Sequence, residues 1–420
     1  MPELIVCLDR LAVGRLSVAA DGLWQFAYNG QGGGDSGSRR TSRPVSLALP
    51  RHQHQFHPET VSAVFGSLLP DGSLRQRVAR SLGLSPANDF ALLERLGQEG
   101  PGALAFYQSG GLPLESPPER VLNDKELRDL VAALPVQPLL ADVDGLAKTL
   151  PGEFDKLPVK LDESGGRVVL GGQLTTHILK TAKPGLRETV MNEAFCMALA
   201  AAAGLPVASA RVLRGSSNVL LVTRVDRVHG ASVLPVHMED FGQALGYPAM
   251  QRYEREGGAR VADLAHLLRA CSTRPGVDIK ALMHWLMFSF LIGFGAGHAR
   301  QLALLHEEDG VRLAPFFGIW STHIYSEMSY RMGVMIGRED RPDWLSPQRW
   351  LECGEDLGVR PRFVVEHLRQ MAAQLPPLAR EVGEAFQRQN GFAEIVKAIQ
   401  SLISQRARQV LVALEVGGAL

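Results

Sequence analysis

The sequence contains little cysteine. Four cysteines, Cys7, Cys196, Cys271 and Cys353, are spread over 420 residues and form no C-x-x-C pair. This spacing argues against a disulfide framework and against a cysteine-based zinc site. We therefore expect a reducing, cytoplasmic environment for the protein.

The sequence also lacks an excess of charge of either sign. Lys and Arg number 44, as do Asp and Glu, so the formal net charge is zero. Such a chain has no global field that would hold a polyanion, and nucleic-acid binding would need a local patch or a basic partner. Direct DNA binding is therefore not expected.

Long apolar runs are almost absent. The N-terminal residues have no basic segment and reach Asp9 and Arg10 early, so no signal peptide is expected. One run, residues 281–297, approaches the length of a membrane span but contains His284 and a glycine-rich end. We interpret it as a buried core helix and expect no membrane partner.

The N-terminal third of the chain predicts a small sheet followed by helices. Short alternating apolar runs over residues 4–28 indicate an antiparallel sheet. Helical spacing covers residues 61–69, 74–82 and 89–96, with Asn88 placed to cap the third helix. Residues 29–44 read as a flexible loop, and the proline-rich stretch 110–144 reads as a linker around one short helix.

The rest of the chain predicts a small α+β lobe and then a helical lobe. Strand-like runs occur at 168–170, 177–180, 210–213 and 219–224, and one helix at 190–203. From residue 259 the pattern is helical, apart from strands near 302–305 and 312–315. An amphipathic stripe closes the chain at Phe392, Ile395, Val396, Ile399, Leu402 and Ile403. The predicted domains are 1–145, 146–235 and 236–420.

A strand lysine followed by a helix glutamate is the first chemical signal. Lys180 falls at the end of a predicted strand and Glu193 on the following helix. Kinases use this arrangement to hold nucleotide phosphates, with the glutamate orienting the lysine as an ion pair. A surface lysine and a solvated glutamate would explain the pair equally well.

Six segments, taken in order, resemble the HipA family of bacterial toxin kinases over the whole chain. Residues 65–71 resemble its LLPD segment, 96–104 its IG-D-VGAL segment, and 149–156 its S-x-x-G-x-Q-x-K loop. Residues 175–180 resemble TTHIIK, 192–193 the helix NE, and 224–227 RFDR. The resemblance implies an α+β, bilobal, protein-kinase-like fold with a β-rich N-terminal subdomain and a helical C-terminal lobe.

The resemblance breaks at the catalytic loop. The family's G-N-x-D-G-H-A-K-N is here residues 293–301, GFGAGHARQ, so Ala296 occupies the Asp position and Gln301 the Asn position. His298 of the loop is kept, and we interpret it as a residue that supports the backbone. Gly318 stands where the family has a metal-binding Asp in P-F-Y-D-I.

These replacements predict a pseudokinase. A methyl group and a hydrogen can neither accept a proton nor coordinate magnesium, which prefers carboxylate and phosphate oxygens. A lost general base alone costs about 10²- to 10⁴-fold in rate. Asp226 and the acidic run Glu307-Glu308-Asp309 are the acids that could compensate, although the run reads as a hairpin turn away from any site. We expect weak ATP binding and no bound magnesium.

The glycine-containing loop carries the remaining cofactor candidates. The resemblance implies that Gly152 and Lys156 belong to the phosphate loop and that Thr149 occupies the autophosphorylated position. Thr149 could instead cap a helix, and Asp155 could cap or pair with Lys156. Phe154 replaces the family's Gln, which puts the loop's fit to phosphate in doubt.

Four further histidines have both a structural and a functional interpretation. His52, His54 and His57 alternate as metal ligands could, but without a nearby acid or cysteine they read as a polar loop. His284, on the apolar run, reads as a satisfied core residue rather than a catalytic one.

The resemblance implies a toxin–antitoxin module. In such a module the HipA-like chain binds a small helix-turn-helix antitoxin (HipB-like), and DNA is contacted only through that partner. Our leading hypothesis is a catalytically impaired protein that acts by binding an antitoxin or a kinase partner. The rival is a residually active Ser/Thr kinase toxin that phosphorylates a translation factor such as a tRNA synthetase. An unrelated chemistry in the same cleft is a third possibility, because fold does not fix function.

Overall fold

The computed structural model describes residues 2–29, 43–109, 117–143, 145–146, 148–172, 174–215, 218–228 and 233–416. Most of the loop predicted at 29–44 and part of the linker predicted at 110–144 lie outside these ranges. The chain divides into two compact units. The first comprises residues 1–181, 215–250 and 304–309, and the second comprises 182–214, 251–303 and 310–420. The three domain ranges expected from the sequence stay a prediction.

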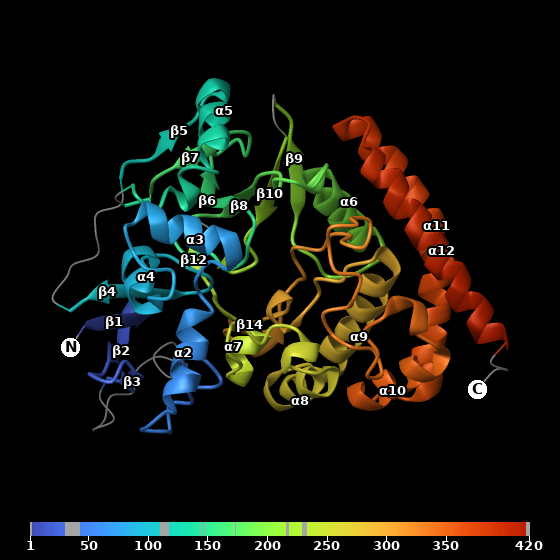
Figure 1. Cartoon of the computed structure of the whole chain (residues 1–420), viewed down its shortest axis with the longest axis horizontal. Coiled ribbons are helices and arrows are strands. Elements are labelled where there is room, and N and C mark those ends of the chain that lie inside the picture. Colours follow the sequence, from blue (N-terminus) through green and yellow to red (C-terminus); the bar gives the residue numbers. More distant parts are fainter. Residues whose placement is uncertain are drawn as a thin grey trace. The chain divides into compact units, whose positions relative to one another are not determined.

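The first unit begins with the predicted antiparallel sheet, which is confirmed (Figure 1). Its strands are β1 (Glu3–Leu8), β2 (Leu11–Val18), β3 (Trp24–Tyr28) and β4 (Leu104–Gln108), in the order β3-β2-β1-β4. Gly14 of β2 lies opposite Tyr28, where a Cβ would fall 2.6 Å from the Ala27 carbonyl oxygen. The position therefore requires glycine. Strand β4 was not predicted from the sequence.

Three helices follow β3 along the chain, as predicted. They are α2 (Pro58–Gly66), α3 (Gly72–Ser81) and α4 (Asp89–Leu96). The Asn88 side chain accepts a hydrogen bond from the Ala91 N–H, which confirms it as the cap of α4. Aromatic rings pack within the largely aliphatic core of this layer: the ring of Phe65 lies 5.3 Å from that of Phe26 and 5.7 Å from that of Phe106.

A second sheet carries the candidate lysines. Its strands in this unit run in the order β5 (Arg120–Val121), β7 (Val168–Leu170), β6 (Lys156–Leu161), β8 (His177–Lys180) and β10 (Val219–Thr223). Helix α5 (Asp124–Ala133) begins with a capping box between Asn123 and Glu126 and is followed by the short η1 (Pro138–Leu140). The remaining elements of the unit are β11 (Arg227–Val228), β12 (Leu234–Pro235), β13 (His237–Asp240), α7 (Phe241–Leu245) and most of β14 (Ala303–Glu307).

The second unit is mainly helical. Its elements are α6 (Thr189–Ala202), β9 (Ala210–Leu213), η2 (Glu254–Glu256), α8 (Val261–Cys271), α9 (Pro275–Ile292), η3 (Ala299–Gln301), β15 (Gly310–Leu313), η4 (Pro342–Trp344), α10 (Pro347–Leu357), α11 (Pro361–Asn390) and α12 (Glu394–Val416). Helices α11 and α12 pack along each other (Figure 1).

The apolar run at 281–297 forms the C-terminal part of α9 and the loop after it. Most of its side chains are buried, and Trp285 is 1% exposed, so the prediction of a core helix is confirmed. Within the described residues, no helix is long and apolar enough to cross a membrane. The amphipathic stripe on α12 is confirmed, except that Phe392 precedes the helix and is 66% exposed beneath Lys397.

Candidate functional site

The two candidate phosphate-binding lysines are neighbours in the second sheet of the first unit. Antiparallel pairing of β6 with β8 places Lys156 directly opposite Lys180. Directly opposed residues point to the same face of a sheet, with Cβ atoms roughly 5 Å apart. Two like charges at this spacing repel each other, so the position favours a nearby anion or carbonyl oxygen.

The loop before β6 supplies a carbonyl oxygen for one of the two lysines. The Lys156 ammonium donates a hydrogen bond to the Pro151 carbonyl oxygen, and a Cβ on Gly152 would lie 2.9 Å from the same nitrogen. Gly152 has a φ of +102°, which other residues rarely adopt. The loop thus wraps around the lysine side chain and depends on glycine to do so.

The loop is also fastened to the LLPD-like segment. The Thr149 hydroxyl donates to the Leu68 carbonyl oxygen, and the Gly152 N–H donates to the Asp71 carboxylate over 3.1 Å. In return, the Asp71 N–H donates to the Gly152 carbonyl oxygen over 3.2 Å. Thr149 is 1% exposed and no helix begins there, so the helix-cap interpretation is wrong.

Asp155 pairs with a different cation from the one considered in the sequence. Its carboxylate lies 2.6 Å from the guanidinium of Arg77 on α3, and the side chain is buried. The alternative of a pair between Asp155 and Lys156 is therefore wrong. The physical reason is that each side chain has another partner: the Asp155 carboxylate pairs with Arg77, and the Lys156 ammonium donates to the Pro151 carbonyl oxygen. Phe154 is partly buried beside it.

Four of the family-like segments meet in one buried ionic network. Glu99 accepts hydrogen bonds from Lys148, from Arg224 over 3.0 Å and from Arg227 over 2.9 Å. Its carboxylate also accepts from the N–H and the hydroxyl of Thr175. The Glu99 carbonyl oxygen accepts from the Thr149 N–H over 3.0 Å, so the network holds the candidate loop in place.

Asp226 completes the same network. Its carboxylate contacts Arg224 at 2.7 Å and Arg227 at 2.9 Å, and accepts from the Gly102 N–H at 2.6 Å. Burial raises the pKa of both acids, but the surrounding cations outweigh it and hold the pKa of Glu99 and that of Asp226 at about 2. The network fully engages Asp226, so it is a poor candidate for a compensating base.

Helix α6 carries Glu193 in the second unit. Glu193 is 4% exposed. The residue before it on the helix, Asn192, is held by several hydrogen bonds. The Asn192 amide donates to the Ser321 carbonyl oxygen over 2.8 Å and to the Tyr325 hydroxyl over 3.1 Å, and its oxygen accepts from the Ser321 N–H. Because Lys180 and Glu193 belong to different units, their ion pair stays a prediction.

The loop that resembles the family's catalytic segment, residues 293–301, has an ordered backbone. The Thr322 hydroxyl accepts from the Gly295 N–H at 2.8 Å and donates to the Gly293 carbonyl oxygen at 3.2 Å. A Cβ on Gly295 would lie 2.2 Å from Nε2 of His323, and one on Gly333 would lie 2.4 Å from the Gly297 carbonyl oxygen. The loop is therefore packed tightly from two sides.

At the positions that the resemblance assigns to the family's base and metal ligands, the side chains present do not fit magnesium. Ala296 is partly exposed and ends in a methyl group. Gln301 closes the single turn η3 and could offer an amide oxygen, but from a longer side chain than the Asn that the family has there. Gly318 has a φ of +66°, a conformation suited to glycine, and supplies no side-chain ligand. Among the described residues, no cluster of three or more His, Cys, Asp or Glu could hold a metal ion.

The histidines near this loop have packing roles. The His298 ring meets the Tyr253 ring edge-on with centroids 5.1 Å apart, and its role in supporting the backbone stays a prediction. Sequence reasoning missed His323, whose Nδ1 accepts from the Arg406 guanidinium at 2.8 Å. Burial and then Arg406 lower the pKa of His323 to about 3, so it is a poor proton acceptor at neutral pH.

The remaining candidates are exposed or partly buried. Glu307 ends β14, and Glu308 and Asp309 form the turn after it; all three are exposed. His52, His54 and His57 are exposed as well, in keeping with a polar loop. His284 on α9 is only partly buried and is hydrogen-bonded at 3.0 Å to His367 of α11.

Comparison with known proteins identifies the family. The model of the HipA N-terminal domain matches residues 4–107, and that of the HipA-like C-terminal domain matches residues 149–379. These matches, with the mixed helix and sheet content, define an α+β protein of kinase-like fold. The chain belongs to the HipA family.

Individual relatives agree with this assignment. A Sinorhizobium fredii protein named "Putative kinase Y4mE" is 36% identical over 324 residues, which are 75% of this chain and 77% of that protein. The serine/threonine-protein kinase toxin HipA of Shewanella oneidensis is 25% identical over 339 residues, 77% of each chain. A solved complex of Shewanella oneidensis HipA, HipB and operator DNA matches with a TM-score of 0.79 and 22% identity, covering 98% of this chain and 97% of that one.

Proposed function

We propose that this chain is a catalytically impaired HipA-family protein that acts by binding a HipB-like antitoxin or a kinase partner. One observation carries the proposal: Ala296, Gln301 and Gly318 occupy the family's base and metal positions. Restoring a side chain at Gly318 would also work against its φ of +66°. Magnesium-dependent phosphoryl transfer uses the carboxylates that the family has at positions 296 and 318, and Ala296 and Gly318 supply none.

An ordered scaffold in each unit supports a binding role. The Thr322 contacts order the loop that contains Ala296, and the Glu99 network separately orders the first unit. In the related Shewanella oneidensis structure, HipA is in complex with HipB and operator DNA. The zero net charge of this chain suits an arrangement in which a basic partner contacts DNA.

Nucleotide binding forms part of the proposal in a weakened form. The opposed Lys156 and Lys180 fit an anionic phosphate group, while Phe154 and the contacts of Gly152 with Asp71 compete with it. We therefore expect ATP to bind weakly and independently of magnesium.

The test is a thermal-shift titration with ATP, with and without magnesium. Bound ligand raises the melting temperature by mass action. A small shift that is the same under both conditions, and smaller in Lys180→Ala, supports the proposal. A large shift seen only with magnesium would favour the rival reading of a residually active Ser/Thr kinase toxin.

A further inference from the structure

Residues 43–49 form an irregular strap whose polar groups bind β13 and β14 in the first unit. The Ser46 hydroxyl donates to the Glu239 carboxylate over 2.6 Å, and the Leu47 N–H donates to that carboxylate over 3.1 Å. The Arg43 guanidinium donates to two carbonyl oxygens of β14 over 2.7 and 2.8 Å. One buried carboxylate, that of Glu239, therefore holds the middle of the strap.

Two histidines lie beside this carboxylate. Nε2 of His306 on β14 lies 2.8 Å from the Glu239 carboxylate, and the His306 ring lies 4.8 Å from that of His237 on β13. His237 is 0% exposed, and its Nε2 donates to the Val45 carbonyl oxygen of the strap over 3.1 Å. Because buried charges need a partner, one carboxylate can balance the charge of only one of the two imidazoles.

The other ring nitrogen of His237 is sealed while the strap is in place. Because a carbonyl oxygen can only accept, Nε2 carries the hydrogen and Nδ1 carries a lone pair. Within the described part of the chain Nδ1 has no hydrogen-bond partner, and a Cβ on Gly102 would lie 3.2 Å from it. Protonation of Nδ1 would therefore create a buried cation whose new N–H finds no acceptor.

The charges that face His237 act in the same direction. Burial is the main reason that the pKa of His237 lies well below its ordinary value of 6.5, and the charges of His306 and Arg43 lower this pKa further. The hydrogen bond to Val45 and the carboxylate of Asp226 oppose them, but two arginines already pair with Asp226. His237 is therefore neutral in the closed structure.

We propose that residues 43–49 are an acid-released strap, which leaves β13 when His237 takes up a proton and thereby exposes the core residues Val45 and Leu49. Val45 covers Nε2 of His237, so the imidazole meets water when the strap opens. Opening then takes up a proton, which means that a falling pH favours the open form and a rising pH the closed form. The strap needs no phosphoryl transfer, and so it stands or falls separately from the function proposed above.

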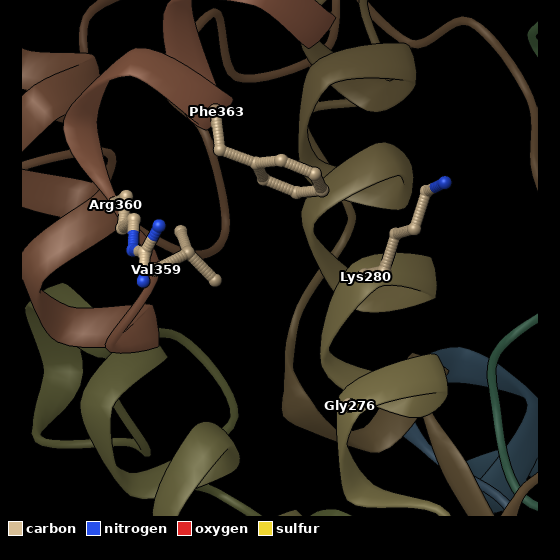
Figure 2. A pocket seen from close by; sticks show the side chains of 5 residues that line it. All are labelled: Gly276, Lys280, Val359, Arg360 and Phe363. Atoms are coloured by element: carbon tan, nitrogen blue, oxygen red, sulfur yellow. The ribbon is translucent and has the colours of Figure 1, made fainter.

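A second pair of histidines lies in the other unit. His284 of α9 is hydrogen-bonded to His367 of α11 over 3.0 Å, and the His367 ring lies 4.2 Å from that of Phe363. Figure 2 shows Phe363 reaching from the start of α11 toward α9. A melting curve of the whole chain responds to this pair, whereas a measurement confined to residues 43–49 does not.

The experiment is hydrogen–deuterium exchange of peptides that span residues 43–49, measured by mass spectrometry between pH 8 and pH 5. After correction for the intrinsic exchange rate, the opening constant of the strap should rise about 30-fold, because the open form binds one proton with the ordinary histidine pKa of 6.5. His237→Gln keeps an N–H that can donate to Val45 but takes up no proton, so its opening constant should change less than about threefold. His52→Gln removes an exposed histidine of the same unit and should behave as the wild type.

Further variants keep the test decisive if His237→Gln does not fold. His237→Met is equally unable to take up a proton and serves the same comparison. Ser46→Ala removes one bond to Glu239 and should raise the opening constant at every pH, with the rise between pH 8 and pH 5 unchanged. Peptides from β1 report opening of the whole layer and should show no such rise. A wild-type rise below about threefold, an equal rise without His237, or an equal rise in the β1 peptides would overturn the proposal.

Discussion

Replacing Glu99 by Gln should destabilise the first unit strongly. The change removes the negative charge that faces Lys148, Arg224 and Arg227 inside the protein and leaves Asp226 to balance all three. The pKa of Glu99 is about 2 against an ordinary 4.5, which corresponds to about 3 kcal/mol at 1.36 kcal/mol per pH unit. Breaking one partner of a buried ion pair typically costs about 3–5 kcal/mol, so the two figures agree.

The assay is thermal unfolding followed by circular dichroism at pH 7. For a unit of roughly 200 residues, a loss of about 3 kcal/mol lowers the melting temperature by about 6–12 °C. Asp129→Asn is the control, because its pair with Lys125 is exposed and worth at most about 0.5 kcal/mol. The double variant with Lys148→Met should lose less than the sum of the two single changes, since the partners interact directly.

The pH dependence provides a further check on the same residue. The folded-state pKa of Glu99 lies below its unfolded value, so its stabilisation is complete above pH 4.5 and is lost as the pH falls toward 2. Glu99→Gln should therefore flatten the acid limb of the stability curve. A loss below 1 kcal/mol at pH 7, or an unchanged acid limb, would refute the reasoning.

Three more predictions concern other parts of the molecule. Asn192→Ala should cost about 2–3 kcal/mol, measured by denaturant unfolding, because it leaves buried groups at Ser321 without their partners. The free energy of unfolding should fall by about 1–2 kcal/mol between pH 6.5 and 4. The lowered pKa values of His284 and His367 keep the folded pair neutral, whereas both histidines become protonated in the unfolded chain. Changing both histidines to Gln should remove this pH dependence. Gly318→Asp should lower stability by about 1 kcal/mol, because residue 318 has a positive φ. Combined with Ala296→Asp and Gln301→Asn, it should restore magnesium-dependent binding in an ATP titration. The triple variant should therefore bind better but melt at a lower temperature.

Helices and strands could be predicted from the sequence wherever a short stretch of residues carried their pattern. The sheet at residues 4–28, the cap at Asn88 and helix α6 were all predicted. Strand β6 was missed because Pro158 lies within it, and proline normally argues against an internal strand. In the structure Pro158 lies opposite Ile178, and the strand pairs on both sides nonetheless.

Only single residues of the candidate site could be predicted from the sequence. The local motifs indicated Lys180 and Ala296. They did not indicate that Glu99 contacts Arg224, which is 125 residues away in the chain. No local pattern records such a contact, because it depends on how distant loops pack. The same holds for Asp155, whose partner Arg77 lies on another element, and for His323, which no motif marks.

The most direct test of the central claim is transfer of radiolabelled phosphate from ATP with magnesium, to the protein itself and to a bacterial lysate. Wild type and Lys180→Ala are compared, and phosphate at Thr149 is sought by mass spectrometry. The account predicts no detectable transfer by either protein, because Ala296 and Gly318 supply neither base nor metal ligand. Transfer by the wild type that Lys180→Ala abolishes would contradict it and would establish an active kinase.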